Sequence, residues 1–223
     1  ESVAQFGDMR DAINDISNQD SQSEILKTLV HHATQFTPRG AFFIVKNEHL
    51  VGWRVFGKEK GAAEEKVREV FLPVASNSVL GEAVKSLTTV ANETGGLAED
   101  ADVLQKLEFG APQKMVAIPL IARGRGVAVL YADYGNEGEN VNVEALETLV
   151  RVAGLTVEVL ASNKAVVSKK PSDKKEDEAP ANNEVSLAET GGLSSEILAN
   201  YQNFGSTSAV ATVAEPAYES FTT

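Results

Sequence analysis

The sequence predicts an α+β fold, and two observations carry this prediction. The first is the segment from Met115 to Asp133, in which two apolar runs flank an Arg-Gly-Arg-Gly link. This pattern is typical of a β-hairpin at the centre of a sheet. The second is the segment from Val143 to about Ser162, whose apolar residues are spaced alternately four and three apart, as in a long helix with one apolar seam.

The first forty residues predict two helices. Residues 1–17 place apolar side chains three to four apart, and the polar residues 18–20 interrupt that stripe. Ser21 and Glu24 then form a capping box, with Ser21 as the cap and the Glu24 side chain reaching back. The second helix ends before Pro38, which cannot continue it.

The middle of the chain predicts short strands with small helices between them. Residues 41–45 and 50–56 form a hairpin that turns at Asn47 and Glu48. The further elements are a polar loop or short helix at 57–68, an extended piece at 71–74, a helix at 78–86, a small strand at 88–91, a turn at 92–96 and helical turns at 98–107.

The predicted C-terminal helix carries a heptad seam. Asn142 is a suitable N-cap for this helix. The seam residues are Leu146, Val150, Ala153, Val157 and Leu160. Such a seam is suited either to pairing with another helix or to lying on the sheet. We expect a homodimer that uses it.

Three regions are expected: an amphipathic helix at 1–20, a folded domain at 21–163, and a low-complexity tail at 164–223. The tail is rich in Lys, Asp and Glu after residue 168 and has little to bury, so we expect it to be mostly disordered. One short amphipathic helix is expected near 193–204, and a protein partner could dock on it or on the terminal helices.

Composition excludes several classes of function. The formal net charge is −12 and no face rich in Lys or Arg is visible, which argues against nucleic-acid binding. The chain has no cysteine, so it has neither disulfides nor thiolate chemistry, and we expect it to be cytoplasmic. No apolar run reaches the roughly twenty residues needed to cross a bilayer, and no membrane association is expected.

The order of elements resembles the GAF sensor-domain family over residues 20–163. The most specific pieces are Ala117-Ile118-Pro119-Leu120 and Gly126-Val127-Ala128-Val129-Leu130. The resemblance implies an antiparallel central sheet, terminal helices packed on one face, and a small-molecule pocket on the other. The motif of cyclic-nucleotide-binding relatives is absent, as are the cysteines of bilin-binding relatives and of methionine-sulfoxide reductases. The sequence therefore does not indicate a particular cofactor.

Five residues are candidates for ligand binding, each with a structural alternative. Trp53 could stack on a planar ligand, but large aromatic residues more often fill cores, and we favour that role. Its neighbour Arg54 points to the opposite face of the strand. Phe71 is the last residue of the segment from Gly57 to Phe71 that follows this strand, and a ligand could contact it there. Tyr131 and Asp133 share one strand face and could contact a ligand, while Asp133 could instead cap the next turn.

No catalytic or metal-binding grouping stands out. His31 and His32 are about 100° apart on a helix, so they cannot chelate one metal together. The leading hypothesis is a non-enzymatic regulatory domain that binds a small molecule or dimerises and signals through its terminal helices. The alternative is a ligand-free scaffold of the same fold that serves protein–protein assembly. Pro119 is unexpected in a central strand, and a bulge there would explain it.

Overall fold

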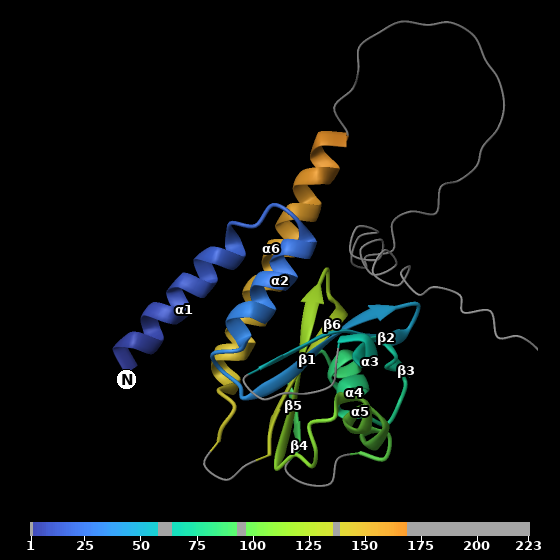
Figure 1. Cartoon of the computed structure of the whole chain (residues 1–223). Coiled ribbons are helices and arrows are strands. Elements are labelled where there is room, and N and C mark those ends of the chain that lie inside the picture. The colour runs from blue at the N-terminus through green and yellow to red at the C-terminus, as the bar shows by residue number, and fades with distance from the viewer. Residues whose placement is uncertain (1, 58–63, 93–96, 136–138, 169–223) are drawn as a thin grey trace, which may run out of the picture.

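A computed structural model describes residues 2–57, 64–92, 97–135 and 139–168, which form one six-stranded sheet with helices on both faces (Figure 1). The elements are α1 (Ser2–Ser17), α2 (Gln22–Ala33), β1 (Arg39–Lys46), β2 (His49–Gly57), α3 (Glu64–Arg68), β3 (Phe71–Pro73), α4 (Val79–Ser86), β4 (Val90–Asn92), α5 (Asp100–Leu107), β5 (Lys114–Ala122), β6 (Arg125–Tyr134) and α6 (Val143–Ser168). The strand order is β3-β2-β1-β6-β5-β4, and every neighbouring pair is antiparallel. The predicted α+β fold is confirmed. The amphipathic segment expected near 193–204 lies outside the described residues.

Local chemistry explains where the elements begin and turn. The Ser21 hydroxyl accepts the Glu24 N–H at 3.2 Å, and the Asn142 side chain accepts the Ala145 N–H at 3.1 Å, so both predicted N-caps are in place. The Glu24 carboxylate accepts from Lys27 at 2.7 Å, rather than reaching back to the cap as expected.

Both hairpins turn through residues with positive φ, as two-residue turns of this kind require. The turn residues are Asn47 (φ 48°), Glu48 (φ 62°), Arg123 (φ 51°) and Gly124 (φ 71°). The two turns therefore fall where the sequence predicts them.

Side chains of the sheet alternate between two apolar cores. The first, here called the terminal-helix core, lies between the sheet and α1, α2 and α6. Its buried residues include Ala12, Ile16, Leu26, Leu29, Val30, Phe42, Ile118, Leu130, Leu146, Leu149, Val150, Ala153 and Val157. The second, the inner-helix core, lies between the sheet and α3, α4 and α5. It includes Phe43, Leu50, Val67, Leu80, Ala83, Leu107, Met115, Val129 and Tyr131.

Helix α1 belongs to the same core as the sheet. Ala12 and Ile16 are completely buried against the rest of the terminal-helix core. The ring of His32 on α2 lies 2.9 Å from the Asp15 carboxylate on α1, which ties the two helices together. Helix α6 continues to Ser168, past the predicted domain boundary at residue 163.

Strand β2 contains a bulge that the sequence did not predict. Trp53 is the unpaired residue of a bulge in β2, because Phe42 pairs with Arg54 and Phe43 with Gly52. The bulge places Trp53 against the terminal-helix core and Val55 against the inner-helix core, so these two residues do not share a face as a regular strand would require.

Pro119 is accommodated by a short neighbour rather than by a bulge at its own position. Strand β4 pairs only with Met115 to Ala117, so Pro119 lies on an edge of the sheet that β4 does not cover. The register shift in this hairpin comes after Pro119, between Leu120 and Ile121. A residue without an N–H is tolerated at such an edge.

Candidate functional site

Three buried side chains of the sheet, Tyr131, Asp133 and Arg39, form a polar cluster. The Tyr131 hydroxyl donates to Asp133 Oδ2 at 2.6 Å, and Arg39 Nε donates to Asp133 Oδ1. Arg39 Nη1 also donates to the carbonyl oxygen of Phe109, whose ring centroid lies 5.5 Å from the guanidinium carbon. The side chains come from β1 and β6, which lie next to each other in the sheet.

Exposure and charge show that this cluster is closed. Tyr131 is 1% exposed, Asp133 0% and Arg39 4%. Burial, and then the neighbouring Asp133 carboxylate, raise the pKa of Tyr131 well above its usual 10.0. The positive charge of Arg39 is balanced by Asp133, so the cluster supports the core and presents no free charge to a ligand.

A second buried carboxylate holds the start of α4. Asp100 accepts the backbone N–H of Val79 at 2.9 Å and of Leu97 at 2.6 Å. The Ser78 hydroxyl caps the same helix by accepting the Gly81 N–H at 3.0 Å. Burial raises the pKa of Asp100 above its usual 3.8, although the two backbone donors act in the opposite direction.

The other candidate ligand residues do not converge on this cluster. Trp53 packs edge to face on Phe42 in the terminal-helix core, with ring centroids 5.7 Å apart. Arg54 pairs with Glu64 of α3 at 3.3 Å. Phe71 is 61% exposed and stacks on His49, at the β3 edge of the sheet. Of the five candidates, the structure brings Tyr131 together with Asp133 in this cluster, and separately places the Arg54 guanidinium carbon 5.2 Å from the centroid of the Trp53 ring.

The predicted heptad seam faces the sheet of its own chain. Leu146, Val150, Ala153 and Val157 are buried in the terminal-helix core, and Leu160 packs against it. Of the two roles the sequence left open, these residues have the one in which the helix lies on the sheet. They are not available to another helix in this conformation.

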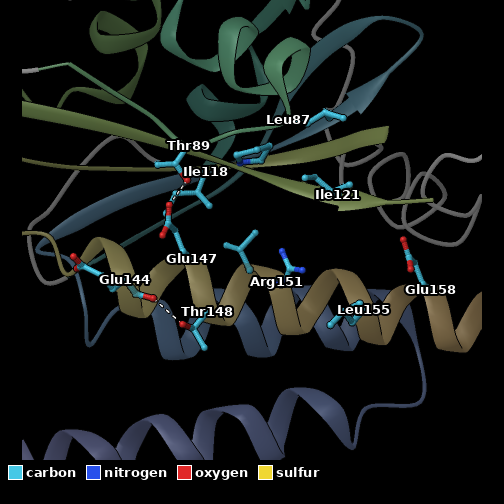
Figure 2. Close-up of a pocket in the computed structure, with 12 residues that line it drawn as sticks. Leu87, Thr89, Ile118, Ile121, Glu144, Glu147, Thr148, Arg151, Leu155 and Glu158 are labelled. Carbon is cyan, nitrogen blue, oxygen red and sulfur yellow. Dashed lines mark hydrogen bonds between the residues drawn. The ribbon is translucent and has the colours of Figure 1, made fainter. Parts of the chain in front are cut away.

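A groove of about 640 Å³ runs between α6, the uncovered edge of β5 and the segment after α4 (Figure 2). Its lining residues are Leu87, Thr89, Ile118, Pro119, Ile121, Glu144, Glu147, Thr148, Val150, Arg151, Leu155 and Glu158. The Thr89 hydroxyl donates to the Glu147 carboxylate, and the Arg123 N–H donates to Glu158. Leu155, on the α6 side, is 54% exposed.

Sequence reasoning missed this groove and the Arg39 partner of Asp133. Positions 39 and 133 are far apart in the chain, and no local pattern links them. For the groove, the one available signal was the proline at 119, which indicates an edge. Among the described residues, no three or more His, Cys, Asp or Glu side chains are placed to hold a metal ion. No helix in the described part is both long and apolar enough for a bilayer crossing.

An antiparallel six-stranded sheet between a layer of terminal helices and a layer of short inner helices defines a sensor-type α+β domain. A sequence model described as the GAF domain matches residues 19–161, and the chain belongs to the GAF domain family. GAF domains are regulatory and sensory domains of signalling proteins.

Solved structures share this fold at low identity. One is the GAF domain of a phosphoenolpyruvate-protein phosphotransferase from Acinetobacter, with 16% identity and a TM-score of 0.52 over 73% of this chain and 96% of that one. Its counterpart from Coxiella burnetii has 12% identity and a TM-score of 0.52 over 74% and 95%. Residues 122 to 287 of a methyl-accepting chemotaxis protein have 14% identity and a TM-score of 0.54 over 69% and 99%. At these identities the likeness shows the fold alone. No curated protein matches the chain.

Proposed function

We propose that this GAF domain is a non-enzymatic regulatory module that works by protein–protein assembly through its terminal helices. The observation that carries the proposal is the filled inner-helix core. Where the resemblance predicted a ligand pocket, Leu80, Leu107, Met115 and Tyr131 are each 2% exposed or less. A ligand between the sheet and α3–α5 would have to displace these side chains.

The polar groups beneath those helices support the same proposal. Tyr131, Asp133 and Arg39 bond to one another, and Asp100 is bonded to the backbone that starts α4. A general acid or base has to reach the proton that it transfers. These groups are buried and engaged, so they favour a structural role over catalysis.

Close packing of the β5–β6 hairpin against helices on both faces of the sheet supports the proposal that α6 transmits changes to a partner. On β6, a Cβ built at Gly126 would lie 3.0 Å from Val84 Cγ1 on α4. On the other side, Gly154 of α6 lies against the backbone of β5, and the Arg123 N–H at the hairpin tip donates to Glu158 of α6. The hairpin therefore touches an inner helix and a terminal helix at once, and a shift of one has to be accommodated by the other.

Native mass spectrometry of the full chain, purified from its own host, tests the proposal. We expect the polypeptide and its multiples or protein complexes, without an added small mass. A denaturing spectrum of the same sample is the control for covalent modification. A small molecule that is retained in the native spectrum and lost in the denaturing one would contradict the ligand-free proposal and support the sensor hypothesis.

A further inference from the structure

The groove between α6 and the uncovered edge of β5 combines exposed apolar side chains with a cation. Ile121 of β5 and Leu155 of α6 line it, and Leu155 is 54% exposed although it is apolar (Figure 2). Arg151, one turn before Leu155, is exposed as well. The lining follows α6 from Glu144 to Glu158, which is about 21 Å at 1.5 Å per residue. The groove is therefore long enough to take a short helix.

The charged side chains of the groove differ in whether the domain already stabilises them. The three glutamates are each stabilised, by the Thr89 hydroxyl for Glu147, by the Arg123 N–H for Glu158 and by the positive end of the α6 dipole for Glu144. In the ranges that the structure describes, the Arg151 side chain forms no hydrogen bond and no ion pair. The occupant that complements this groove is therefore apolar and carries an anionic group.

The chain itself contains a segment with an apolar helical stripe downstream of α6. Residues 193–204 carry four large apolar side chains at helical spacing, namely Leu193, Ile197, Tyr201 and Phe204. At 100° per residue, these four fall within about 80° of one another around a helix axis. Gly205 follows directly, and glycine is the residue most often found just past the end of a helix. A helix over these residues is about 18 Å long, which matches the length of the groove.

The charge of this segment complements the charge that the groove leaves unpaired. Glu196 is the one charged residue among residues 193–204. It lies about 60° from Leu193 around the helix axis, at the border of the apolar stripe. A segment with its stripe in the groove therefore presents a single carboxylate at the rim, where it can meet Arg151.

The stretch that joins α6 to this segment has the length that docking requires. Helix α6 ends at Ser168, and Arg151, near the middle of the groove, lies about 25 Å back along the helix axis. A flexible chain with the length of residues 169–192 has an r.m.s. end-to-end distance of about 25–29 Å. The effective concentration of a tethered segment is greatest when these two lengths match, and it reaches the millimolar range. A contact too weak to hold a separate peptide is therefore sufficient within one chain.

We propose that residues 193–204 dock as an amphipathic helix in the α6–β5 groove of their own chain, with the apolar stripe against Ile121 and Leu155 and with Glu196 paired to Arg151. This is the helix-in-groove mode of recognition, with the helix supplied in cis. The docking itself does not depend on the proposed function. Its consequence for regulation does, because a protein partner that approaches this side of α6 has to displace the segment.

Paramagnetic NMR of the full chain tests the docking. The chain has no cysteine, so Gln202→Cys places one nitroxide label on the segment, on the side away from its apolar stripe. We expect the label to broaden the amide signals of Arg151 and Leu155 and to leave that of Phe71, at the opposite edge of the sheet, unchanged. A label that leaves the groove amides sharp, or that broadens Phe71 as strongly, would overturn the proposal.

Two aspartate substitutions in the segment form a matched pair. Ile197→Asp places a charge within the apolar stripe, whereas Ala199→Asp places the same charge about 160° away around the helix axis. Ile197→Asp should weaken docking by roughly tenfold or more and sharpen the groove signals, because the burial of an isoleucine side chain is lost. Ala199→Asp should leave these signals broadened. Equal effects of the two changes would contradict docking through the stripe.

Charge exchange tests the contact between Glu196 and Arg151. Arg151→Glu should weaken docking by roughly two- to fivefold, the effect expected of an exposed ion pair. The double variant Arg151→Glu with Glu196→Lys restores opposite charges and should recover the broadening of the Leu155 amide. A double variant that docks no better than Arg151→Glu would refute this ion pair.

A mixed sample separates docking in cis from contacts between chains. Spin-labelled chain without isotope is added to isotope-labelled chain without the spin label, at the concentration of the first experiment. We expect sharp signals at Arg151 and Leu155, and broadening in this mixture would overturn docking within one chain. The native mass spectrum is independent of this result: a retained small molecule contradicts the proposed function, whereas sharp groove signals in the spin-labelled chain contradict the docking alone.

Discussion

Removing the Asp133 side chain should cost a large part of the stability of this domain. Asp133 is completely buried and accepts bonds from Arg39 and Tyr131. Asp133→Ala removes the carboxylate to which Arg39 and Tyr131 donate, and breaking a buried ion pair in this way costs about 3–5 kcal/mol. Unfolding of a domain costs about 5–15 kcal/mol, so we expect a loss of about a fifth or more of the free energy of unfolding.

The double replacement Arg39→Met with Asp133→Leu separates the cost of breaking the ion pair from the net contribution of the pair. Each single change should cost about 3–5 kcal/mol, whereas the double change should be within about 2 kcal/mol of the wild type, because apolar pairs often replace buried ion pairs at little cost. The single effects then sum to far more than the double effect, which is the signature of direct coupling.

Urea unfolding followed by the fluorescence of Trp53, the one tryptophan of the chain, measures these free energies. Asp20→Ala is the matched control, because that carboxylate is exposed and its removal should change stability by no more than about 0.5 kcal/mol. If Asp133→Ala costs less than about 1 kcal/mol, the carboxylate is hydrated in solution. The inner-helix core would then be open to water, and our argument against a ligand there would fail.

Three further predictions concern protonation and packing. The pKa of Tyr131 is raised in the folded state, so near pH 10 the unfolded chain releases the hydroxyl proton while the folded chain keeps it. The free energy of unfolding should therefore fall as pH rises above about 10. In Tyr131→Phe the midpoint of urea unfolding should fall less steeply over the same pH range. The pKa of Asp100 is also raised in the folded state, so protonation of this carboxyl stabilises the fold; this contribution to the free energy of unfolding is complete below pH 3.8 and is lost as pH rises through the folded pKa. The free energy of unfolding of the wild type, relative to that of Asp100→Asn, should therefore grow on acidification toward about pH 4. A difference that stays constant with pH would contradict this. Gly154→Ala should destabilise the domain by about 1–3 kcal/mol, because the new Cβ would lie 2.6 Å from the Ile121 carbonyl oxygen; this cost exceeds the roughly 1 kcal/mol by which alanine favours a helix over glycine. Gly7→Ala is the control, because a Cβ at Gly7 would have no atom within 4 Å, and it should be neutral or stabilising in thermal melts.

Local signals predicted most of the fold. The turn at Asn47 and Glu48 and the caps at Ser21 and Asn142 depend on neighbouring residues, so the sequence displays them directly. Alternation along β6 also placed Tyr131 and Asp133 on one face. These features need no knowledge of distant parts of the chain.

What escaped prediction depends on pairing between distant segments. The bulge at Trp53 is a property of the β1–β2 register, and the environment of Pro119 depends on how short β4 is. The role of Asp133 depends on Arg39, which comes from another strand. The alternation of side chains along a strand predicts the face on which each side chain lies but not its partner on that face. A structural ion pair and a ligand site therefore give the same sequence pattern.

The periodicity of α6 carried a similar ambiguity, and the two stripes of the helix resolve it. A heptad seam indicates that one face of a helix is covered, without saying whether the cover is its own sheet or another chain. Val150, Ala153 and Val157 meet the sheet of their own chain, so the strongest apolar signal is used within the monomer. The residues left for a partner are the weaker and more exposed pair, Leu155 and Val159. An assembly surface on this helix is therefore to be sought where hydrophobic patterning is least regular, and where exposure and charge together are the guide.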